Sequence, residues 1–346
     1  MATVDITIMG AGIFGMSIAW ACARRGAKVR VVDPRGVGGG ASGGVVGALA
    51  PHTPERWEPK KAFQFESLIM AEDFWAEVDA ASGLASGYGR TGRLQPIADD
   101  HTLALARERV VAAVTLWEGK AKWQVCQVEE FTDWVPTSPT GLVVHDTLTA
   151  RIDPRRACDS LARALSGLTV QVVPAADPEG RVVWATGYEG LLEMSRDYGR
   201  EVGNGVKGQA VLFKYDAGDV PQYFTEGLHF IAHDNGTVAV GSTSERYFDD
   251  PLATDTLLDN LIDRALVVCP QLAGAKVLAK WAGVRPRAKT RAPMLGAYPD
   301  RPGHFIANGG FKIGFGMAPK VAEIMADLVL DEIDLIPEEF RVEANL

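Results

Sequence analysis

The residues with the clearest chemical potential begin at Gly10-Ala-Gly12-Ile-Phe-Gly15, which follows a β-branched run at residues 4–9. A helix-forming segment comes next, Gly26 is placed to end that helix with a positive φ, and a second β-branched run ends in Asp33. A strand, a GxGxxG turn, a helix and a second strand ending in an acid are typical of a dinucleotide site. The glycines would admit a diphosphate to the helix N-terminus, and Asp33 would accept hydrogen bonds from the adenosine ribose. A purely structural turn is the alternative.

A Gly/Ala/Ser-rich stretch at residues 36–52 follows, where a nicotinamide dehydrogenase would normally continue with its third strand. Because side chains this small pack no core, the stretch fits backbone passing over a large flat ligand, with its N–H groups and the Ser42 hydroxyl meeting phosphate and ring oxygens. A flexible surface loop is the alternative, but Val45, Val46 and Leu49 argue against full exposure. The stretch therefore favours a flavin over a nicotinamide.

Glycines gather a second time at residues 309–316, after a predicted strand at 304–308. Residues 10–47 hold eleven of the 37 glycines, and residues 296–316 hold six. A helix is expected to open at Met317, with Pro319 in its first turn, and to run to about Asp331. The dipole of such a helix would stabilise negative charge on the N1–C2=O edge of a reduced flavin.

Arginine and lysine side chains precede this second cluster. Arg285 lies in Trp281-Ala-Gly-Val-Arg-Pro, where its guanidinium could bind a carboxylate through two parallel hydrogen bonds. Arg287 and Arg291 are expected to be solvated surface charges.

Composition narrows the class of protein that positions these residues. The 346 residues are 47% hydrophobic and 23% charged, which fits about two folded domains. A net charge of −9 argues against nucleic-acid or anionic-membrane partners, and no apolar run is long enough to span a bilayer. The start of the chain does not resemble a signal peptide, and four scattered cysteines without a CxxC pair predict a cytoplasmic protein with no metal site.

Periodicity predicts the elements between the glycine clusters. Helices are expected at residues 63–82, 102–122 and 254–269, the first with an apolar face of Leu68, Ala71, Phe74, Trp75 and Val78. Strands of an antiparallel sheet are expected at 209–215, 223–232 and 237–242, with Asn235-Gly236 as a hairpin turn.

Together these segments resemble the FAD-dependent D-amino-acid oxidase superfamily, most closely its glycine oxidase and sarcosine oxidase branch. The resemblance covers nearly the whole chain and implies an α/β fold with a Rossmann-like FAD-binding domain at residues 1–50, 145–205 and 290–346. A substrate-binding domain of α+β type, built on an antiparallel sheet, would comprise residues 51–144 and 206–289. The segments that carry the resemblance are residues 10–15 with Asp33, 41–52, 152–156, 182–187, 207–209, 240–243, 281–286 and 309–319.

The resemblance also implies site residues. Arg285 matches the arginine that binds the substrate carboxylate, His229 falls where the branch has a substrate-facing tyrosine, and Lys312 stands where it usually has an arginine. His233 replaces another arginine, and Ser244 lies near the place of a lysine thought to activate oxygen. No cysteine follows Arg285, so FAD is expected to bind non-covalently. The residues expected to hold it are Gly10, Gly12, Ile13, Phe14, Gly15, Asp33, Pro34, Arg35, Ala41, Ser42, Gly47, Ala48, Leu49, Val173, Gly187, Gly310, Phe311, Lys312, Ile313, Gly314 and Phe315.

The implied activity is oxidation of the C–N bond of a small amino acid or secondary amine, by hydride transfer to flavin N5, giving an imine that hydrolyses. Oxygen or another electron acceptor would reoxidise the flavin, and the alternative is a dehydrogenase that passes electrons to a quinone or protein. His229 is expected either to position the amine, titrating near the working pH, or to be a buried structural residue. A tRNA-modifying flavin domain and a nicotinamide-dependent dehydrogenase are less favoured. The sequence does not determine whether the chain forms a homo-oligomer.

Overall fold

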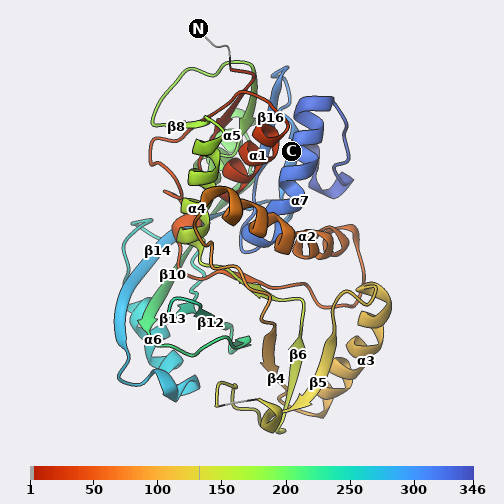
Figure 1. Cartoon of the computed structure of the whole chain (residues 1–346), viewed down its shortest axis with the longest axis vertical. Coiled ribbons are helices and arrows are strands. Elements are labelled where there is room, and N and C mark those ends of the chain that lie inside the picture. The colour runs from red at the N-terminus through yellow and green to blue at the C-terminus, as the bar shows by residue number, and fades with distance from the viewer. Residues whose placement is uncertain (1–3, 132) are drawn as a thin grey trace.

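A six-stranded sheet forms one half of the computed structural model, which describes residues 4–131 and 133–346 (Figure 1). The strand order is β15-β16-β9-β1-β2-β8, and every neighbouring pair is parallel except β15 with β16. This doubly wound arrangement confirms the predicted Rossmann-like fold. The strands are β1 (Ile6–Met9), β2 (Val29–Val32), β8 (Gln171–Val173), β9 (Arg181–Trp184), β15 (Met294–Ala297) and β16 (His304–Asn308).

An eight-stranded sheet forms the other half, in the order β14-β10-β13-β12-β11-β4-β6-β5. It differs from the predicted antiparallel sheet in one respect, because β11 and β4 are parallel. The strands are β4 (Arg93–Pro96), β5 (Trp123–Gln127), β6 (Leu142–Asp146), β10 (Gly203–Lys214), β11 (Gln222–Thr225), β12 (Leu228–His233), β13 (Thr237–Gly241) and β14 (Lys276–Ala288); β3 (Ala48–Leu49) pairs separately with β7 (Ala150–Arg151).

Two predicted elements of this half are wrong in extent. The expected strand at 223–232 is two strands, because Glu226 and Gly227 have positive φ and form a turn between β11 and β12. The expected helix at 102–122 is α3 (Asp100–Leu116), since Asp99 caps its start and Glu118 takes a positive φ beyond its end. The third helix, α6 (Thr256–Val268), lies where predicted, and Asn235-Gly236 forms the expected turn between β12 and β13.

Helices α1 (Ile13–Arg24), α4 (Pro154–Gly167) and α7 (Gly314–Ala326) cover the six-stranded sheet, with α1 in contact with both of the others. A short π-helical segment at Asp327–Asp331 continues α7. Because α7 begins three residues earlier than predicted, Pro319 lies inside it and not in its first turn. The missing N–H of Pro319 leaves the Phe315 carbonyl without its usual helical donor. On the other side of this half, α5 (Gly187–Asp197) contacts β10 and β14.

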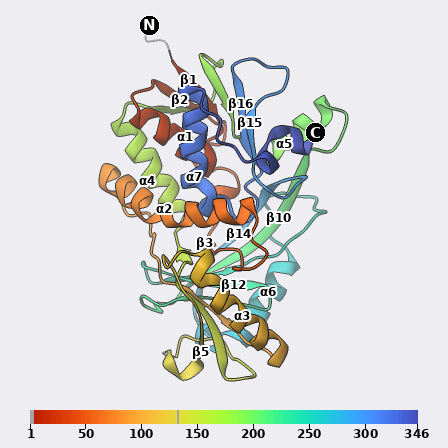
Figure 2. The same cartoon turned by 90° about the vertical axis from the view of Figure 1, so that its right-hand side faces the viewer.

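Helix α2 (Pro59–Ser82) joins the two halves of the molecule (Figure 2). Its predicted apolar face is buried except for a partly exposed Phe74. That face packs on α4 and α7, so this helix of the expected substrate domain contributes to the core beneath the other sheet. The strands of the six-stranded sheet come from all three expected FAD-domain segments, although the domain boundaries themselves stay a prediction.

Two general features complete the fold. Within the described residues, no helix combines the length and the apolar character needed to cross a bilayer. All four cysteines have free thiols, and three of them are buried.

Candidate active site

A cavity of about 750 Å³ lies between the two sheets. Its wall is built from the turn between β1 and α1, the loop at residues 40–52, the start of α5, strands β4, β10, β11, β12 and β14, and the loop before α7. This size falls within the range of small-molecule and cofactor sites. The two glycine clusters, far apart in the sequence, therefore meet around one space.

At one end of the cavity Asp33 closes the first strand–helix–strand unit. Its Oδ2 accepts a hydrogen bond from the Ala11 N–H and its Oδ1 accepts one from the Arg35 N–H, each at 2.9 Å. The carboxylate is held by backbone and still borders the cavity. The Arg35 side chain also lines this end, and its guanidinium forms an ion pair with Glu189. Both residues lie where an adenosine ribose would be expected.

The N-terminus of α1 offers a site for the diphosphate. Gly12 is its N-cap residue and provides no side-chain cap, and no acid lies in the first turn. A Cβ on Gly12 would lie 3.3 Å from Ser42 Oγ, so a side chain there would fill the space between the helix end and the loop. Ser42 Oγ accepts the Ile13 N–H at 2.9 Å, which holds the hydroxyl oxygen against the N-terminus of the helix. The N–H groups at the start of α1 and the space beside Gly12 fit a bound anion.

The loop predicted to cover the flavin is packed too closely to be flexible. A Cβ on Gly47 would lie 1.8 Å from the Ile152 carbonyl oxygen, so only glycine fits. His233 Nε2 lies 3.1 Å from the Val45 carbonyl oxygen and fastens the loop to β12. His233 is buried and does not line the cavity, so this departure from the family pattern supports the loop rather than the substrate.

The second glycine loop leads into α7 at the opposite end of the cavity. Ile313 is the N-cap residue of α7 and provides no side-chain cap, which leaves N–H groups of the first turn available to a ligand. A Cβ on Gly310 would lie 2.9 Å from the Phe14 ring, and Phe311 takes a positive φ of 42°. This close backbone approach suits a planar ligand with a charge-accepting edge at the helix N-terminus.

Arg285 enters the cavity from β14. Its Nη2 donates to Ser242 Oγ and to the Thr243 carbonyl oxygen, each at 2.9 Å. Its Nη1 is buried and has no partner in the described chain. Burial lowers the pKa of Arg285 to about 10, and Glu245 opposes that shift, so the guanidinium stays charged at neutral pH. A buried cation with one unpaired donor is a receptor for a carboxylate.

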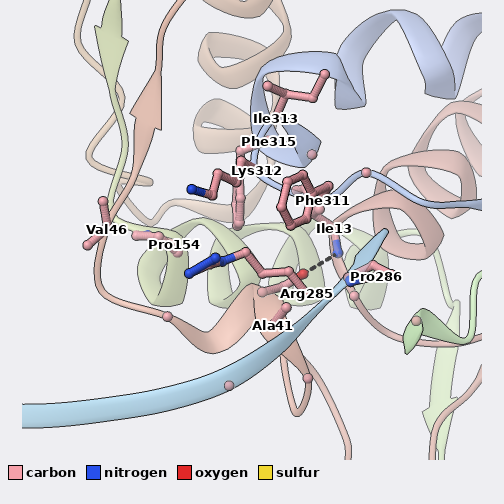
Figure 3. A pocket seen from close by; sticks show the side chains of 18 of the residues that line it. Ile13, Ala41, Val46, Pro154, Arg285, Pro286, Phe311, Lys312, Ile313 and Phe315 are labelled. Atoms are coloured by element: carbon pink, nitrogen blue, oxygen red, sulfur yellow. Dashed lines mark hydrogen bonds between the residues drawn. The ribbon is translucent and has the colours of Figure 1, made fainter. Parts of the chain in front are cut away.

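Lys312 extends from the loop before α7 in the same direction as Arg285 (Figure 3). Burial and the nearby Arg285 lower the pKa of the lysine. Its Nζ lies 5.8 Å from the centre of the Phe311 ring, and it forms no ion pair with any residue that the structure describes. The two cations give this end of the cavity a positive potential.

His229 faces the cavity from β12, beside Phe224, whose ring centre is 4.6 Å from that of the imidazole. Burial, followed by the charges of Arg93 and Lys312, lowers the pKa of His229 to about 3. The expectation that this histidine titrates near the working pH is therefore not met. Its Nδ1 is buried without a hydrogen-bond partner in the described residues.

Most of the predicted site residues line this one cavity. Gly10 and Gly15 do not, because they shape the turn itself: a Cβ on Gly15 would lie 1.9 Å from the Gly10 carbonyl oxygen. Pro34 and Val173 also lie outside it, and Val173 pairs with Val32 at the sheet edge. The predicted residues that line the cavity are Gly12, Ile13, Phe14, Asp33, Arg35, Ala41, Ser42, Gly47, Ala48, Leu49, Gly187, His229, Arg285, Gly310, Phe311, Lys312, Ile313, Gly314 and Phe315.

Sequence reasoning missed several lining residues. Arg93 and Phe224 lie in segments without any motif, and only their position in the eight-stranded sheet brings them to the cavity. His52 and Gln64 also line it and are hydrogen-bonded to each other. The glycine-rich stretch at residues 36–52 ends at His52, so the sequence indicated that this histidine lies near the site. Nothing in the sequence indicated that Gln64 is its hydrogen-bond partner.

The family follows from comparison with known proteins. A family model described as FAD dependent oxidoreductase matches residues 5–328. The chain belongs to this FAD-dependent oxidoreductase family. Its cofactor is FAD. The space beside Gly12 and the uncapped N-termini of α1 and α7 fit this cofactor.

Known members of the family resemble this oxidoreductase along its whole length. Glycine oxidase of Pseudomonas putida is 26% identical over 376 residues, covering 99% of each chain. The structure of glycine oxidase from Geobacillus kaustophilus has a TM-score of 0.82 at 19% identity, covering 98% of both chains. L-Proline dehydrogenase from P. horikoshii has a TM-score of 0.81 at 18% identity, covering 98% of this chain and 97% of that one. The two structures share the fold with this oxidoreductase.

Replacing Asp33 with alanine is expected to weaken FAD retention without changing how fast the loaded oxidoreductase is reduced. The carboxylate organises two backbone N–H groups at the nucleotide end, away from Arg285. The dissociation constant of FAD, measured by titrating the apoprotein, should rise. Asp5→Ala is the matched control, because Asp5 also accepts a backbone N–H, from Lys28, but does not line the cavity. A slower reduction of fully loaded Asp33→Ala enzyme would contradict this assignment.

His229 should make the stability of the protein depend on pH below neutrality. Its pKa falls from 6.5 to about 3 on folding, so the unfolded chain binds the proton more readily. The stabilising contribution is complete above about pH 6.5 and decreases as the pH falls towards 3. His229→Gln should therefore lose less unfolding free energy than the wild type between pH 6.5 and 4, as measured by urea denaturation. Equal losses in the two proteins would show that His229 is not held neutral.

Proposed function

We propose that this chain oxidises the C–N bond of a small amino acid or secondary amine, forming an imine that water hydrolyses to a carbonyl compound and an amine. The observation that carries the proposal is the buried guanidinium of Arg285, which keeps an unpaired Nη1 at the cavity. A substrate carboxylate would satisfy that donor and offset the cost of burying the charge. The similarity to glycine oxidase in both sequence and fold supports this class of substrate.

The residues of the cavity would act mainly by orienting the substrate. Ser242 and the Thr243 carbonyl fix the guanidinium of Arg285, so a bound carboxylate would have one position. The neutral His229 and the Phe224 ring form a wall on β11 and β12 against which the rest of the substrate would rest. In the part of the chain that the structure describes, no carboxylate lines the cavity around Arg285, so we assign no general base and attribute catalysis to positioning and electrostatics.

The cofactor would be held along the opposite wall. Gly12 and the loop at residues 41–49 would enclose its diphosphate, Asp33 its ribose, and the loop at 310–315 its ring. FAD, when bound, supplies a two-electron acceptor for the hydride that leaves the substrate carbon. The N-terminus of α7 would stabilise negative charge near that ring, and Lys312 adds a second positive group on the same side.

An anaerobic reduction screen tests the proposal. Loaded protein is mixed with glycine, sarcosine and the D- and L-amino acids, each paired with the amine that lacks its carboxylate, and flavin absorbance is followed. At least one amino acid should bleach the flavin, and its decarboxylated partner should do so far more slowly. If no amino acid bleaches it, or if the decarboxylated amines work equally well, the proposal is wrong.

The same samples assign the electron acceptor. Oxidase and dehydrogenase share this fold, with TM-scores of 0.82 and 0.81. We propose oxygen as the acceptor and a quinone or protein partner as the alternative. After bleaching, admission of air should restore flavin absorbance much faster than in free reduced flavin. A rate no faster than that of free flavin would favour the dehydrogenase.

A further inference from the structure

One face of the eight-stranded sheet forms the floor of the substrate end of the cavity. One row of residues crosses five adjacent strands, each residue directly opposite the next. In the order β11, β12, β13, β10 and β14, the row is Phe224, His229, Gly241, Ala210 and Trp281. Side chains two residues apart on a strand share a face. Arg285 on β14 therefore lies on the same face as Trp281.

Arg93 lies on this face as well. It pairs with Gln222 on β11, two residues from Phe224, and it lines the cavity. The face therefore carries an arginine at each end, with Phe224, His229, Gly241 and Ala210 between them. In contrast to Arg285, Arg93 lies in none of the segments that carry the family resemblance.

Arg285 reaches inward across this floor. A Cβ on Gly208 would lie 1.5 Å from Arg285 Nη2, so the guanidinium lies directly over the neighbouring strand β10. From there it reaches Ser242, which follows the end of β13. Three strand spacings, from β13 through β12 and β11 to β4, separate this point from the backbone of Arg93, which is roughly 14 Å.

Arg93 is held so that part of its guanidinium stays available. The side chain is 8% exposed, and its Nε donates to Asp146 Oδ2 at 2.9 Å. Asp146 is fully buried, and its Oδ1 accepts the Thr149 N–H at 2.8 Å. Neither terminal nitrogen of Arg93 has a hydrogen-bond partner among the described residues. Asp146 thus fixes the guanidinium through Nε and leaves its outer edge for a ligand.

The charges around this floor are unbalanced. The cations that line the cavity here are Arg93, Arg285 and Lys312. Among the described residues, the carboxylates that line it are Asp33 and Glu189, which flank Arg35 at the nucleotide end. Asp146 neutralises part of the charge of Arg93 from behind, yet that charge still helps to lower the pKa of His229. A positive site of this kind favours a ligand that brings more than one negative charge.

We propose that the substrate carries a second anionic group several bonds from its carboxylate, and that Arg93 binds this group while Arg285 binds the carboxylate. The inference rests on the proposed function and names its substrate class: acidic amino acids or N-carboxyalkyl amines. Glycine and sarcosine carry one carboxylate each, so neither offers an anion to both guanidinium groups. Phe224 and His229 would contact the apolar carbons between the two anions. Arg93 is then a specificity-determining residue.

The test compares isosteric substrates that differ by one charge. Anaerobic stopped-flow reduction is measured with D- and L-glutamate against D- and L-glutamine, and with iminodiacetate against its monoamide. In the wild type the anionic member should have the higher ratio of reduction rate to dissociation constant, by tenfold or more. Arg93→Gln should abolish that preference, so that the ratio for the anionic member falls to that for the neutral member. Arg90→Gln is the matched control, because Arg90 is nearby in sequence but does not line the cavity.

Two further measurements keep the test decisive. Arg93→Gln leaves Asp146 without its partner and could prevent folding. In that case the double variant Arg93→Gln/Asp146→Asn, which removes both charges, is used in place of the single variant. Titration with glutarate and with butyrate, followed by the flavin visible spectrum, measures binding without turnover, and glutarate should bind at least tenfold more tightly. A neutral substrate that matches its anionic partner would overturn the inference while leaving amine oxidation intact. If no amine bleaches the flavin, the proposed function fails, and the two titrations still decide whether Arg93 binds an anion.

Discussion

Arg285→Ala is expected to raise KM for the substrate sharply while the protein still purifies yellow. The guanidinium is buried, is oriented by Ser242 and Thr243, and has an unpaired Nη1 at the cavity. Removing one partner of a buried charged pair costs about 2–5 kcal/mol, which corresponds to roughly 30-fold to several thousand-fold in kcat/KM. Steady-state kinetics with the amino acid that bleaches the flavin fastest measures the change. Free guanidinium should restore part of the activity.

Arg287 offers the matched control for this change. It lies two residues further along β14 but does not line the cavity, so Arg287→Ala should have kinetics close to those of the wild type. Arg285→Lys keeps the charge without the planar fork, and we expect it to fall between the wild type and Arg285→Ala. If Arg285→Ala loses FAD and keeps its KM, then the arginine belongs to the cofactor site and the carboxylate assignment is wrong.

Gly12→Val is expected to give a folded protein that purifies without colour. Gly12 has an extended backbone, with φ −80° and ψ 179°, which valine adopts without strain. Its Cβ would already lie 3.3 Å from Ser42 Oγ, and the two valine methyl groups would occupy the approach to the α1 N-terminus. FAD content after purification and circular dichroism measure the two properties. Gly167→Val is the control, because nothing lies within 4 Å of the Cβ at that position. A yellow Gly12→Val protein would place the diphosphate elsewhere.

The cofactor half of the site could be predicted because its signals are local. The turn at residues 10–15, the acid at the end of β2 and the loop at 41–49 each lie within one continuous segment. The turn and the loop need glycine where other backbone comes close, as it does at Gly15 and Gly47. The first helix nevertheless begins at Ile13, inside the motif, and α7 begins at Gly314. Those boundaries depend on backbone conformations in the glycine loops that composition does not determine.

The substrate half was less accessible because it depends on strand pairing. Arg93, Phe224, His229 and Arg285 meet only after β4, β11, β12 and β14 have taken their places in one sheet. Strand register is not encoded in any single segment, and the turn at Glu226-Gly227 that separates β11 from β12 lacks the Asn-Gly signal of the next hairpin. The depressed pKa of His229 likewise arises from burial and from charges supplied by distant segments.

Single-turnover stoichiometry shows whether the cavity oxidises a C–N bond. Loaded protein is mixed without oxygen with one equivalent of the amino acid that bleaches it fastest, and the released amine or ammonia is quantified against the flavin reduced. We expect one molecule of amine or ammonia and one of oxo acid for each flavin reduced. Flavin reduction without release of an amine or ammonia would contradict it.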